Sequence, residues 1–264
     1  MIPKIIHYCW FGGNPKPEIV EKCIQSWKKF CPDWEIKEWN ESNFDVNSTP
    51  FTAEAYASKK WAFVSDVARL AILKQHGGVY MDTDVEIKES IDKLLDYNAF
   101  FVFESNRYIA TGLGFGCIAE HPAVNSMLEF YNGKHFIVNG KIKMIPCPAG
   151  NTEALCALYR EFRQDGTSQK FSDVLVVSPA DYNRCAHHYG AATWVEGEKP
   201  VRKAYRDTRL KRYLRRPSNF NFVDAHFGKK AVKAYTFLVY DLMESGPIYY
   251  LRRLIKKKFY PTAR

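Results

Sequence analysis

Two aspartates separated by one residue follow a short apolar run in the segment 77–87, GGVYMDTDVEI. In an extended strand residues i and i+2 point the same way, so Asp82 and Asp84 would face one cation. Mg²⁺ and Mn²⁺ bind carboxylate, water and phosphate oxygens in preference to soft ligands. A solvated loop explains an isolated Asp-x-Asp better, but this pair ends a buried strand, where open α/β sheets bind ligands. An EF-hand is excluded because Ile87 stands where that loop requires glycine, so we predict a different divalent-metal site.

The helical pattern before that segment carries a second pair of opposite charges. Asp66 and Arg69 are three residues apart and share one helix face. A surface ion pair of little energetic consequence would explain them. A site at the edge of the core would explain them too, because apolar residues flank Ser65 and Asp66. In that case the carboxylate binds hydroxyls and the guanidinium binds phosphate oxygens, and periodicity alone leaves both interpretations open.

Three further features follow apolar runs and are candidates for lining a pocket. Trp10 ends the first run, where a tryptophan is either part of the core or a platform that stacks a nucleobase. The run 111–116, TGLGFG, lacks both the Walker ending and the dinucleotide fingerprint. We therefore expect a close-approach turn that lines a pocket. Glu104 is explained by an exposed strand end or by a sugar contact.

A late cluster combines His187-His188-Tyr189 with Thr193-Trp194. Adjacent histidines on an extended segment face opposite ways, so only one of them would serve a shared site. A histidine pair satisfied within a loop is the simpler explanation. No Gly-x-Ser-x-Gly elbow or Cys/His spacing supports nucleophilic hydrolysis.

Composition indicates a globular protein with one large domain or a domain and an appendage. The 264 residues are 46% apolar and 25% charged, which is ordinary for that class. No run of about 18 uncharged apolar residues occurs, so we expect no transmembrane helix. The N-terminus lacks the features of a signal peptide, and we expect a cytoplasmic protein. Seven scattered cysteines without a Cys-x-x-Cys pair favour reduced, packed thiols over zinc binding or disulfides.

Hydrophobic periodicity predicts an α/β fold. A strand, a helix and a strand over 2–10, 17–30 and 34–39 favour a parallel sheet covered by helices. After a loop, one helix over 53–76 leads to Gly77 as its stop signal and then to the strand at Asp82. The other predicted elements are a short helix at 91–95, strands at 99–103 and 174–177, a loop at 146–151, and helices at 122–131, 152–163, 232–243 and 248–259.

Positive charge is concentrated beyond residue 198. Residues 1–198 hold 20 Lys and Arg against 25 Asp and Glu, whereas residues 199–264 hold 18 against 4. We predict a boundary there, between a catalytic domain and a basic helical extension. Within the extension, 248–259 places bulky apolar residues at helical spacing among Lys and Arg, which is typical of a helix lying on an anionic membrane. A solvated basic face and a nucleic-acid patch are the alternatives, and we expect no nucleic-acid partner.

Taken in chain order, these segments resemble the glycosyltransferases of family 32, the DXD-containing sugar transferases. That family includes capsular-polysaccharide enzymes and relatives of the yeast initiating mannosyltransferase. The resemblance is carried by residues 2–13, 26–40, 61–69 and 77–85, and it becomes looser towards residue 195. It implies a GT-A fold, in which a mostly parallel central sheet binds a nucleotide-sugar at its strand ends.

The resemblance implies a donor site built from five residues. Trp10 would stack the nucleobase, as its counterpart does in the related glucosylating toxins. Asp66 and Arg69 would hold the ribose or donor sugar and the diphosphate side. Ser65 and Tyr80 would line the same site.

The resemblance also implies a metal site. Asp82 and Asp84 would hold Mn²⁺ or Mg²⁺, with Asp84 as the more direct ligand. His188 resembles the family's late histidine near the metal and the diphosphate. Thr193 and Trp194 resemble its Ser-Trp pair, at a spacing from the histidines that is one residue longer, and Trp194 would join the donor site.

Together these expectations describe a metal-dependent glycosyltransferase that uses a UDP-linked donor and retains the anomeric configuration. The acceptor would be a surface polysaccharide or a polyprenyl-linked glycan, met at the inner face of the cytoplasmic membrane. Two alternatives stay open. One is a nucleotide-sugar hydrolase or phosphotransferase that uses the same carboxylates, and the other is a non-catalytic glycan- or nucleic-acid-binding protein that uses the basic tail.

Overall fold

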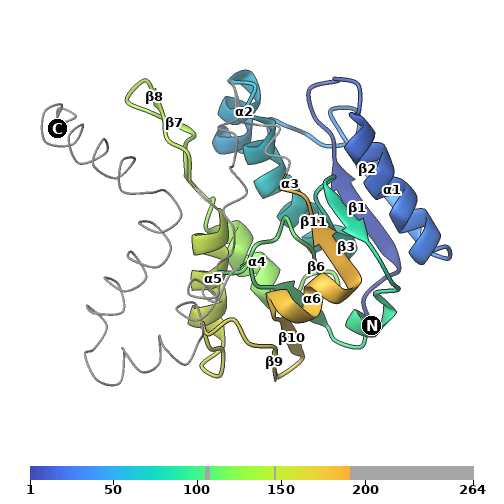
Figure 1. The fold of residues 1–264 in the computed structure, drawn as a ribbon. Coiled ribbons are helices and arrows are strands. Elements are labelled where there is room, and N and C mark those ends of the chain that lie inside the picture. The colour runs from blue at the N-terminus through green and yellow to red at the C-terminus, as the bar shows by residue number, and fades with distance from the viewer. Residues whose placement is uncertain (105–107, 146, 191–264) are drawn as a thin grey trace, which may run out of the picture. The chain divides into compact units, whose positions relative to one another are not determined.

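The structure, a computed structural model, describes residues 1–104, 108–145 and 147–190, and Figure 1 shows their arrangement. The predicted helices at 232–243 and 248–259, the predicted boundary at residue 198, and Thr193 and Trp194 lie outside the described residues. All statements of structure below concern the described part of the chain.

A mixed seven-stranded sheet forms the centre of the fold, with the order β2-β1-β3-β6-β5-β10-β9. β2, β1, β3, β5 and β10 run in one direction, while β6 and β9 run in the other. The predicted α/β class with a mostly parallel sheet is confirmed. The strands are β1 (Ile5–Cys9), β2 (Glu35–Trp39), β3 (Gly78–Tyr80), β5 (Ala99–Val102), β6 (Phe115–Cys117), β9 (Gln169–Phe171) and β10 (Val174–Val177).

Helices cover both faces of this sheet, because neighbouring strand residues are apolar on both sides. Phe101 packs in the cluster that includes α3 (Trp61–His76), α4 (Pro122–Glu129) and α5 (Cys147–Leu158). Phe100 packs in a second cluster with α1 (Glu18–Phe30) and the turn η1 (Asp92–Leu94). A strand buried on both faces reads as a continuous apolar run, which explains why β5 could be predicted from sequence.

The opening β1-α1-β2 unit agrees with its prediction. β1 pairs with β2 in parallel from Ile5 opposite Glu35 to Cys9 opposite Trp39. α1 buries its predicted apolar face, with the Trp27 indole fully enclosed and donating to the carbonyl of Val85. That bond ties the helix to the strand that follows the aspartates.

The single helix predicted over 53–76 is wrong, because the chain forms two helices there. α2 (Pro50–Ala57) begins at Thr49, whose hydroxyl accepts from the Thr52 amide while Thr52 returns a bond to the Thr49 amide. The chain then turns at Lys59, which has a φ of 55°, before α3 begins. The left-handed backbone conformation of Lys59 interrupts the helical hydrogen bonding, and no glycine or proline in the sequence indicates this break.

Two other predictions needed correction. The glycine-rich run 111–116 does form a turn, but its last residues begin β6, which pairs antiparallel with both β3 and β5. α5 starts at Cys147 and ends at Leu158, instead of covering 152–163 after a loop. Pro148 is tolerated there because the first helical turn needs no amide donor at that position.

Five short elements complete the described domain. β4 (Val85–Ile87) pairs antiparallel with β11 (Ala186–His188), which follows α6 (Pro179–Cys185). β7 (Ile137–Val138) and β8 (Lys141–Ile142) form a separate hairpin. No helix among the described residues is long and apolar enough to span a membrane. All seven cysteines are free and six are buried, which agrees with the predicted packing of the thiols.

Candidate active site at the end of β3

The two aspartates lie in a turn between β3 and β4, and not on one strand face as predicted. β3 ends at Tyr80, and the Val85 amide donates to the carbonyl of Asp82 at 3.1 Å, which closes the turn. The carboxylates therefore meet different partners. The turn still follows the carboxyl end of a central strand, where α/β sheets place their ligands.

Arg69 holds the first of these carboxylates in place. One of its terminal nitrogens, Nη2, lies 3.2 Å from Asp82 Oδ1 and 3.1 Å from Asp66 Oδ1. Its Nε donates to the carbonyl of Ser65 at 3.0 Å, and the guanidinium carbon lies 4.8 Å from the centre of the Tyr80 ring. The arginine side chain is 4% exposed, so the predicted pair with Asp66 is a buried one and not a surface ion pair. Removing one partner of such a pair costs far more than at the surface.

The Asp66 carboxyl has a raised pKa because it is buried. Burial raises its pKa, against the positive charge of Arg69 and a hydrogen bond with the Cys147 thiol, which favour the ionised form. Burial likewise raises the pKa of Cys147 well above its usual value, so that thiol stays protonated. The cause is desolvation, which disfavours charge wherever water is excluded.

Tyr80 and Gly112 complete the surroundings of Asp82. The Tyr80 hydroxyl donates to Asp82 Oδ1 at 3.1 Å, and the Asp82 amide donates to the carbonyl of Gly112 at 2.9 Å. A Cβ added at residue 112 would stand 2.2 Å from Asp82 Oδ2 and 3.0 Å from Nη1 of Arg69. The predicted close-approach turn is thus confirmed, and its neighbour is the first aspartate.

The second aspartate faces the late histidine. β11 runs beside β4 with His188 opposite Val85, and His188 Nε2 lies 3.2 Å from Asp84 Oδ1. Burial lowers the pKa of His188, but the hydrogen bond and the charge of Asp84 outweigh it, so the net effect is a raised pKa. The neighbouring Tyr189 amide donates to the Asp84 carbonyl at 3.0 Å.

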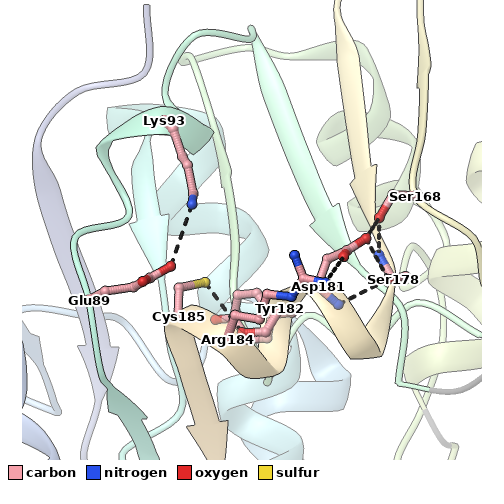
Figure 2. Close-up of polar contacts among 8 residues, drawn as sticks. All are labelled: Glu89, Lys93, Ser168, Ser178, Asp181, Tyr182, Arg184 and Cys185. Carbon is pink, nitrogen blue, oxygen red and sulfur yellow. Dashed lines mark hydrogen bonds and ion pairs between the residues drawn. The ribbon is translucent and has the colours of Figure 1, made fainter.

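α6 leads directly into β11, and Figure 2 shows the contacts that cap the start of this helix. Ser178 caps the helix: its hydroxyl accepts from the Asp181 amide at 3.1 Å and donates to the Asp181 carboxylate at 2.8 Å. Ser168 donates to the same carboxylate, which ties the cap to the chain just before β9. At the other end the Lys88 amide donates to the Cys185 carbonyl at 2.7 Å.

A cavity of about 350 Å³ opens beside His188. Its walls come from the end of β5, the turn after it, α6 and β11, and they include Leu113, as expected for a pocket-lining turn. Tyr182 borders it and donates to the Leu113 carbonyl at 2.8 Å. Glu104 is exposed on the rim. The cavity therefore offers a mixed wall of carboxylate, imidazole and aliphatic carbon.

Trp10 follows β1 and is half-buried. Its indole nitrogen donates to the carbonyl of Asn14 at 2.7 Å, which fixes the ring at the start of the loop. Trp61 from α3 lies against the same loop, where a Cβ on Gly12 would approach its indole to 2.6 Å. The stacking role of Trp10 stays a prediction.

The carboxylates suit a hard divalent cation that is completed by ligands from outside the protein. Among the described residues, no group of three or more His, Cys, Asp or Glu side chains could hold a metal by itself. Asp82, Asp84 and His188 thus form no closed cage of protein ligands. Mg²⁺ is commonly bound by one or two carboxylates together with phosphate oxygens and water, and the donor set here fits that mode.

The structure brings together most of the predicted site. Asp66, Arg69, Tyr80 and Asp82 form one network around the buried Arg69, and Asp84 of the same turn pairs with His188 of β11. The sequence did not predict a role for Cys147, because nothing in its proline-flanked segment indicated a contact with Asp66, about 80 residues earlier.

Comparison with known proteins finds similar sequences that overlap the candidate site. Residues 17–101 match the family model described as "Glycosyltransferase sugar-binding region containing DXD motif". Over these residues the chain is similar to a DXD-type sugar-binding region, in agreement with the resemblance drawn from its sequence. The matched range contains Asp66, Arg69 and both aspartates of the turn.

The relatives are glycosyltransferases by name. An uncharacterized glycosyltransferase of Acanthamoeba polyphaga mimivirus is 31% identical over 128 residues, covering 46% of this chain and 51% of that protein. Inositol phosphoceramide mannosyltransferase 3 of Schizosaccharomyces pombe is 31% identical over 147 residues, covering 51% of this chain and 40% of that protein. The chain thus spans about half the length, or less, of these curated relatives. Among solved structures, one titled "PaToxG Glycosyltransferase" aligns with a TM-score of 0.47 at 20% identity, over 60% of this chain and 70% of that one.

Proposed function

We propose that this protein is a metal-dependent glycosyltransferase that moves a sugar from a UDP-linked donor to a lipid-linked or polysaccharide acceptor. One observation carries the proposal. Asp82 and Asp84 occupy the turn after a central strand, and Arg69, Tyr80 and Gly112 hold Asp82 in a single position. A carboxylate fixed in this way is preorganised for a ligand, whereas a surface aspartate is not.

In this proposal Asp82 and Asp84 hold Mn²⁺ or Mg²⁺ against the donor diphosphate. The ion would neutralise the charge that develops on the departing diphosphate. Arg69 acts as a positioning residue, because its buried guanidinium is already engaged by Asp66 and Asp82. His188, when protonated, adds positive charge beside Asp84 and the leaving group.

The cavity beside His188 is the proposed place for sugar. His188, the partner of Asp84, and Glu104 both line it, so hydroxyls bound there would find both a cation and an anion. Transfer with retention requires the acceptor oxygen to approach the face that the diphosphate leaves. Trp10, half-buried beyond β1, remains the proposed stacking surface for the nucleobase.

The acceptor class follows from the names of relatives and from the basic tail. The Schizosaccharomyces pombe relative is named for mannosyl transfer to inositol phosphoceramide, a lipid with a polar headgroup. Residues 248–259, with their alternation of basic and bulky apolar side chains, would lie on an anionic membrane where such a lipid is found. We accordingly propose a peripheral enzyme at the inner face of the cytoplasmic membrane, acting on a lipid-linked or polymeric glycan.

Product analysis tests the proposal. The purified chain would be incubated with UDP-sugars and Mn²⁺, with and without a polyprenyl-phosphate-linked sugar or inositol phosphoceramide. We expect a new glycosidic bond by mass spectrometry in the wild type, and at least a 100-fold lower rate in Asp84→Asn. Asp96→Asn, which changes an exposed aspartate just after η1, is the matched control and should keep full activity.

Each alternative has its own outcome. Free sugar without transfer to any acceptor would identify a hydrolase and overturn the transferase assignment. Full activity of Asp84→Asn in Mn²⁺ would overturn the metal site. Salt-sensitive binding of glycan or nucleic acid by the full chain, with no turnover of any UDP-sugar, would support a non-catalytic binding protein instead.

A further inference from the structure

The β7–β8 hairpin is an unusual surface feature that the active site does not use. Figure 1 shows it extending from the body of the described domain. Its strands are joined by Asn139-Gly140, both with positive φ, 52° and 69°, which is the two-residue turn that matches the twist of a tight hairpin. Every residue from 137 to 144 is exposed.

The exposed side chains on this hairpin are apolar to a degree not expected of a solvated loop. Ile137 and Ile142 are directly opposite each other and therefore share a face. Val138 lies on the other face, and Met144 continues the strand beyond Ile142. Their exposed fractions are 38% for Ile137, 40% for Val138, 47% for Ile142 and 58% for Met144. These four are half of the large hydrophobic side chains exposed among the described residues.

The hairpin is also positively charged. Lys141 and Lys143 form no ion pair with any described residue, and Lys134 stands at the base with its ammonium 3.9 Å from the Phe130 ring centre. No Asp or Glu occurs between Glu129 and Glu153. Apolar side chains beside unpaired lysines match the chemistry of an anionic bilayer, with acyl chains below a layer of phosphates.

The base of the hairpin is anchored, so its tip can be presented outwards. Glu54 of α2 accepts from the Ile137 amide at 2.8 Å and lies 2.6 Å from His135. Phe136 is fully buried against Phe51 and Phe63. A two-stranded hairpin has little stability of its own, so this clamp keeps the ribbon folded without a core.

We propose that the β7–β8 hairpin inserts Ile137, Val138, Ile142 and Met144 into the interface of an anionic membrane, with Lys141 and Lys143 against lipid phosphates. Charge argues against the chain's own residues 199–264 as the occupant, because they carry 18 Lys and Arg against 4 Asp and Glu and would repel the lysines. The usefulness of such an anchor rests on the proposed function, since a lipid-linked acceptor lies at that surface. The hairpin contains no residue placed in the active site.

Vesicle co-sedimentation of the full chain tests the proposal. Binding to phosphatidylcholine vesicles containing one-third phosphatidylglycerol should weaken at least about tenfold in Ile137→Ser/Ile142→Ser/Met144→Ser, because the inserted apolar surface is lost. Lys141→Ser/Lys143→Ser should weaken it on the order of 20-fold at low salt, at about fivefold per lysine. Leu158→Ser, which removes an equally exposed apolar side chain on α5, is the matched control and should bind as the wild type does.

The outcomes separate this proposal from the proposed function. Equal binding by the wild type and both hairpin variants would overturn the proposal. A different outcome would also overturn it: the wild type does not bind vesicles but forms a concentration-dependent dimer by light scattering, and the hairpin variants do not form this dimer. Hydrolysis of the UDP-sugar in solution without vesicles should be unchanged in the hairpin variants. If vesicle binding depends on the hairpin but no sugar is turned over, the proposed function fails and the membrane contact stands.

Discussion

Asp82 owes its position to three residues from three different elements. Arg69 comes from α3, Tyr80 from β3, and Gly112 from the turn before β6. Each of them restricts the conformations open to the Asp82 carboxylate. The glycine contributes by the absence of a side chain, since any Cβ at residue 112 would occupy the space of Asp82 Oδ2. The site is thus built on close approach as much as on attraction.

Gly112→Ala tests that close approach. The added methyl should push the Asp82 carboxylate away from Arg69 and Tyr80, and a misplacement of about 1 Å can cost about 100-fold in rate. Because the displaced atoms belong to a short side chain that can rotate, we expect a stability loss of only about 1 kcal/mol. The measurements are initial rates with Mn²⁺ and the midpoint of urea unfolding.

Gly150→Ala is the control for that substitution. Residue 150 is also a buried glycine, but the three atoms nearest to its added Cβ would all belong to the Phe130 ring, at 3.1 to 3.2 Å. It should leave the rate unchanged. A Gly112→Ala enzyme with the wild-type rate would show that Asp82 does not need its observed position.

At the scale of elements, β1 and β3 are joined through a buried histidine. His7 is fully enclosed, its Nδ1 accepts from the Trp39 indole at 3.0 Å, and its Nε2 lies 3.0 Å from the Gly77 carbonyl. Since the indole can only donate, Nδ1 carries no proton and Nε2 donates to Gly77. The Met81 amide returns a bond to the His7 carbonyl at 3.1 Å, one residue before Asp82.

This histidine predicts a pH dependence of stability. Burial lowers its pKa from 6.5 to about 4, so between those values the unfolded chain binds a proton that the folded chain does not. Stability therefore rises with pH from about 4 to 6.5 and is lost as the solution is acidified through that window. At pH 4.5 this one group should lower the free energy of unfolding by about 2 to 3 kcal/mol relative to pH 7.

Urea unfolding of the wild type and His7→Gln, followed at pH 4.5 and pH 7, measures that contribution. The glutamine keeps an acceptor for Trp39 but does not titrate, so the difference between the two pH values should shrink by the stated amount. Carboxylates and other histidines titrate in both proteins and cancel in the comparison. Identical pH profiles would contradict the assignment of a neutral, buried His7.

The elements also show what a sequence can and cannot predict here. Local sequence signals were sufficient to predict the end of α3 and two strands. Gly77 ends α3 with a φ of 65°, and continuous apolar runs mark β5 and β10. Pairing over long distances left no such signal. β6 is three residues long with Gly116 at its centre, and β11 reaches β4 from a hundred residues away. That second pairing brings His188 to Asp84, so the histidine could be proposed by resemblance but not by periodicity.

Across the whole described domain, the proposed donor site and the proposed membrane-binding hairpin are separate features. The turn at the end of β3 and the cavity beside His188 lie in the sheet domain. The β7–β8 hairpin extends from this domain and is anchored at its base by the bond between Ile137 and Glu54. The basic residues 199–264 add a second proposed attachment that sequence alone suggests. Two weak anchors together hold a protein on a surface far better than either does alone.

In the proposed mechanism Asp82-Thr83-Asp84 binds a divalent ion together with a nucleotide diphosphate. Calorimetric titration of the full chain with UDP, in the presence and absence of Mn²⁺, measures this without any acceptor. We expect Mn²⁺ to tighten UDP binding at least about tenfold in the wild type and in Asp96→Asn, because the metal completes its ligands from the diphosphate. Asp84→Asn should lose that enhancement while unfolding at a similar urea concentration. An equal Mn²⁺ effect in Asp84→Asn would contradict the account.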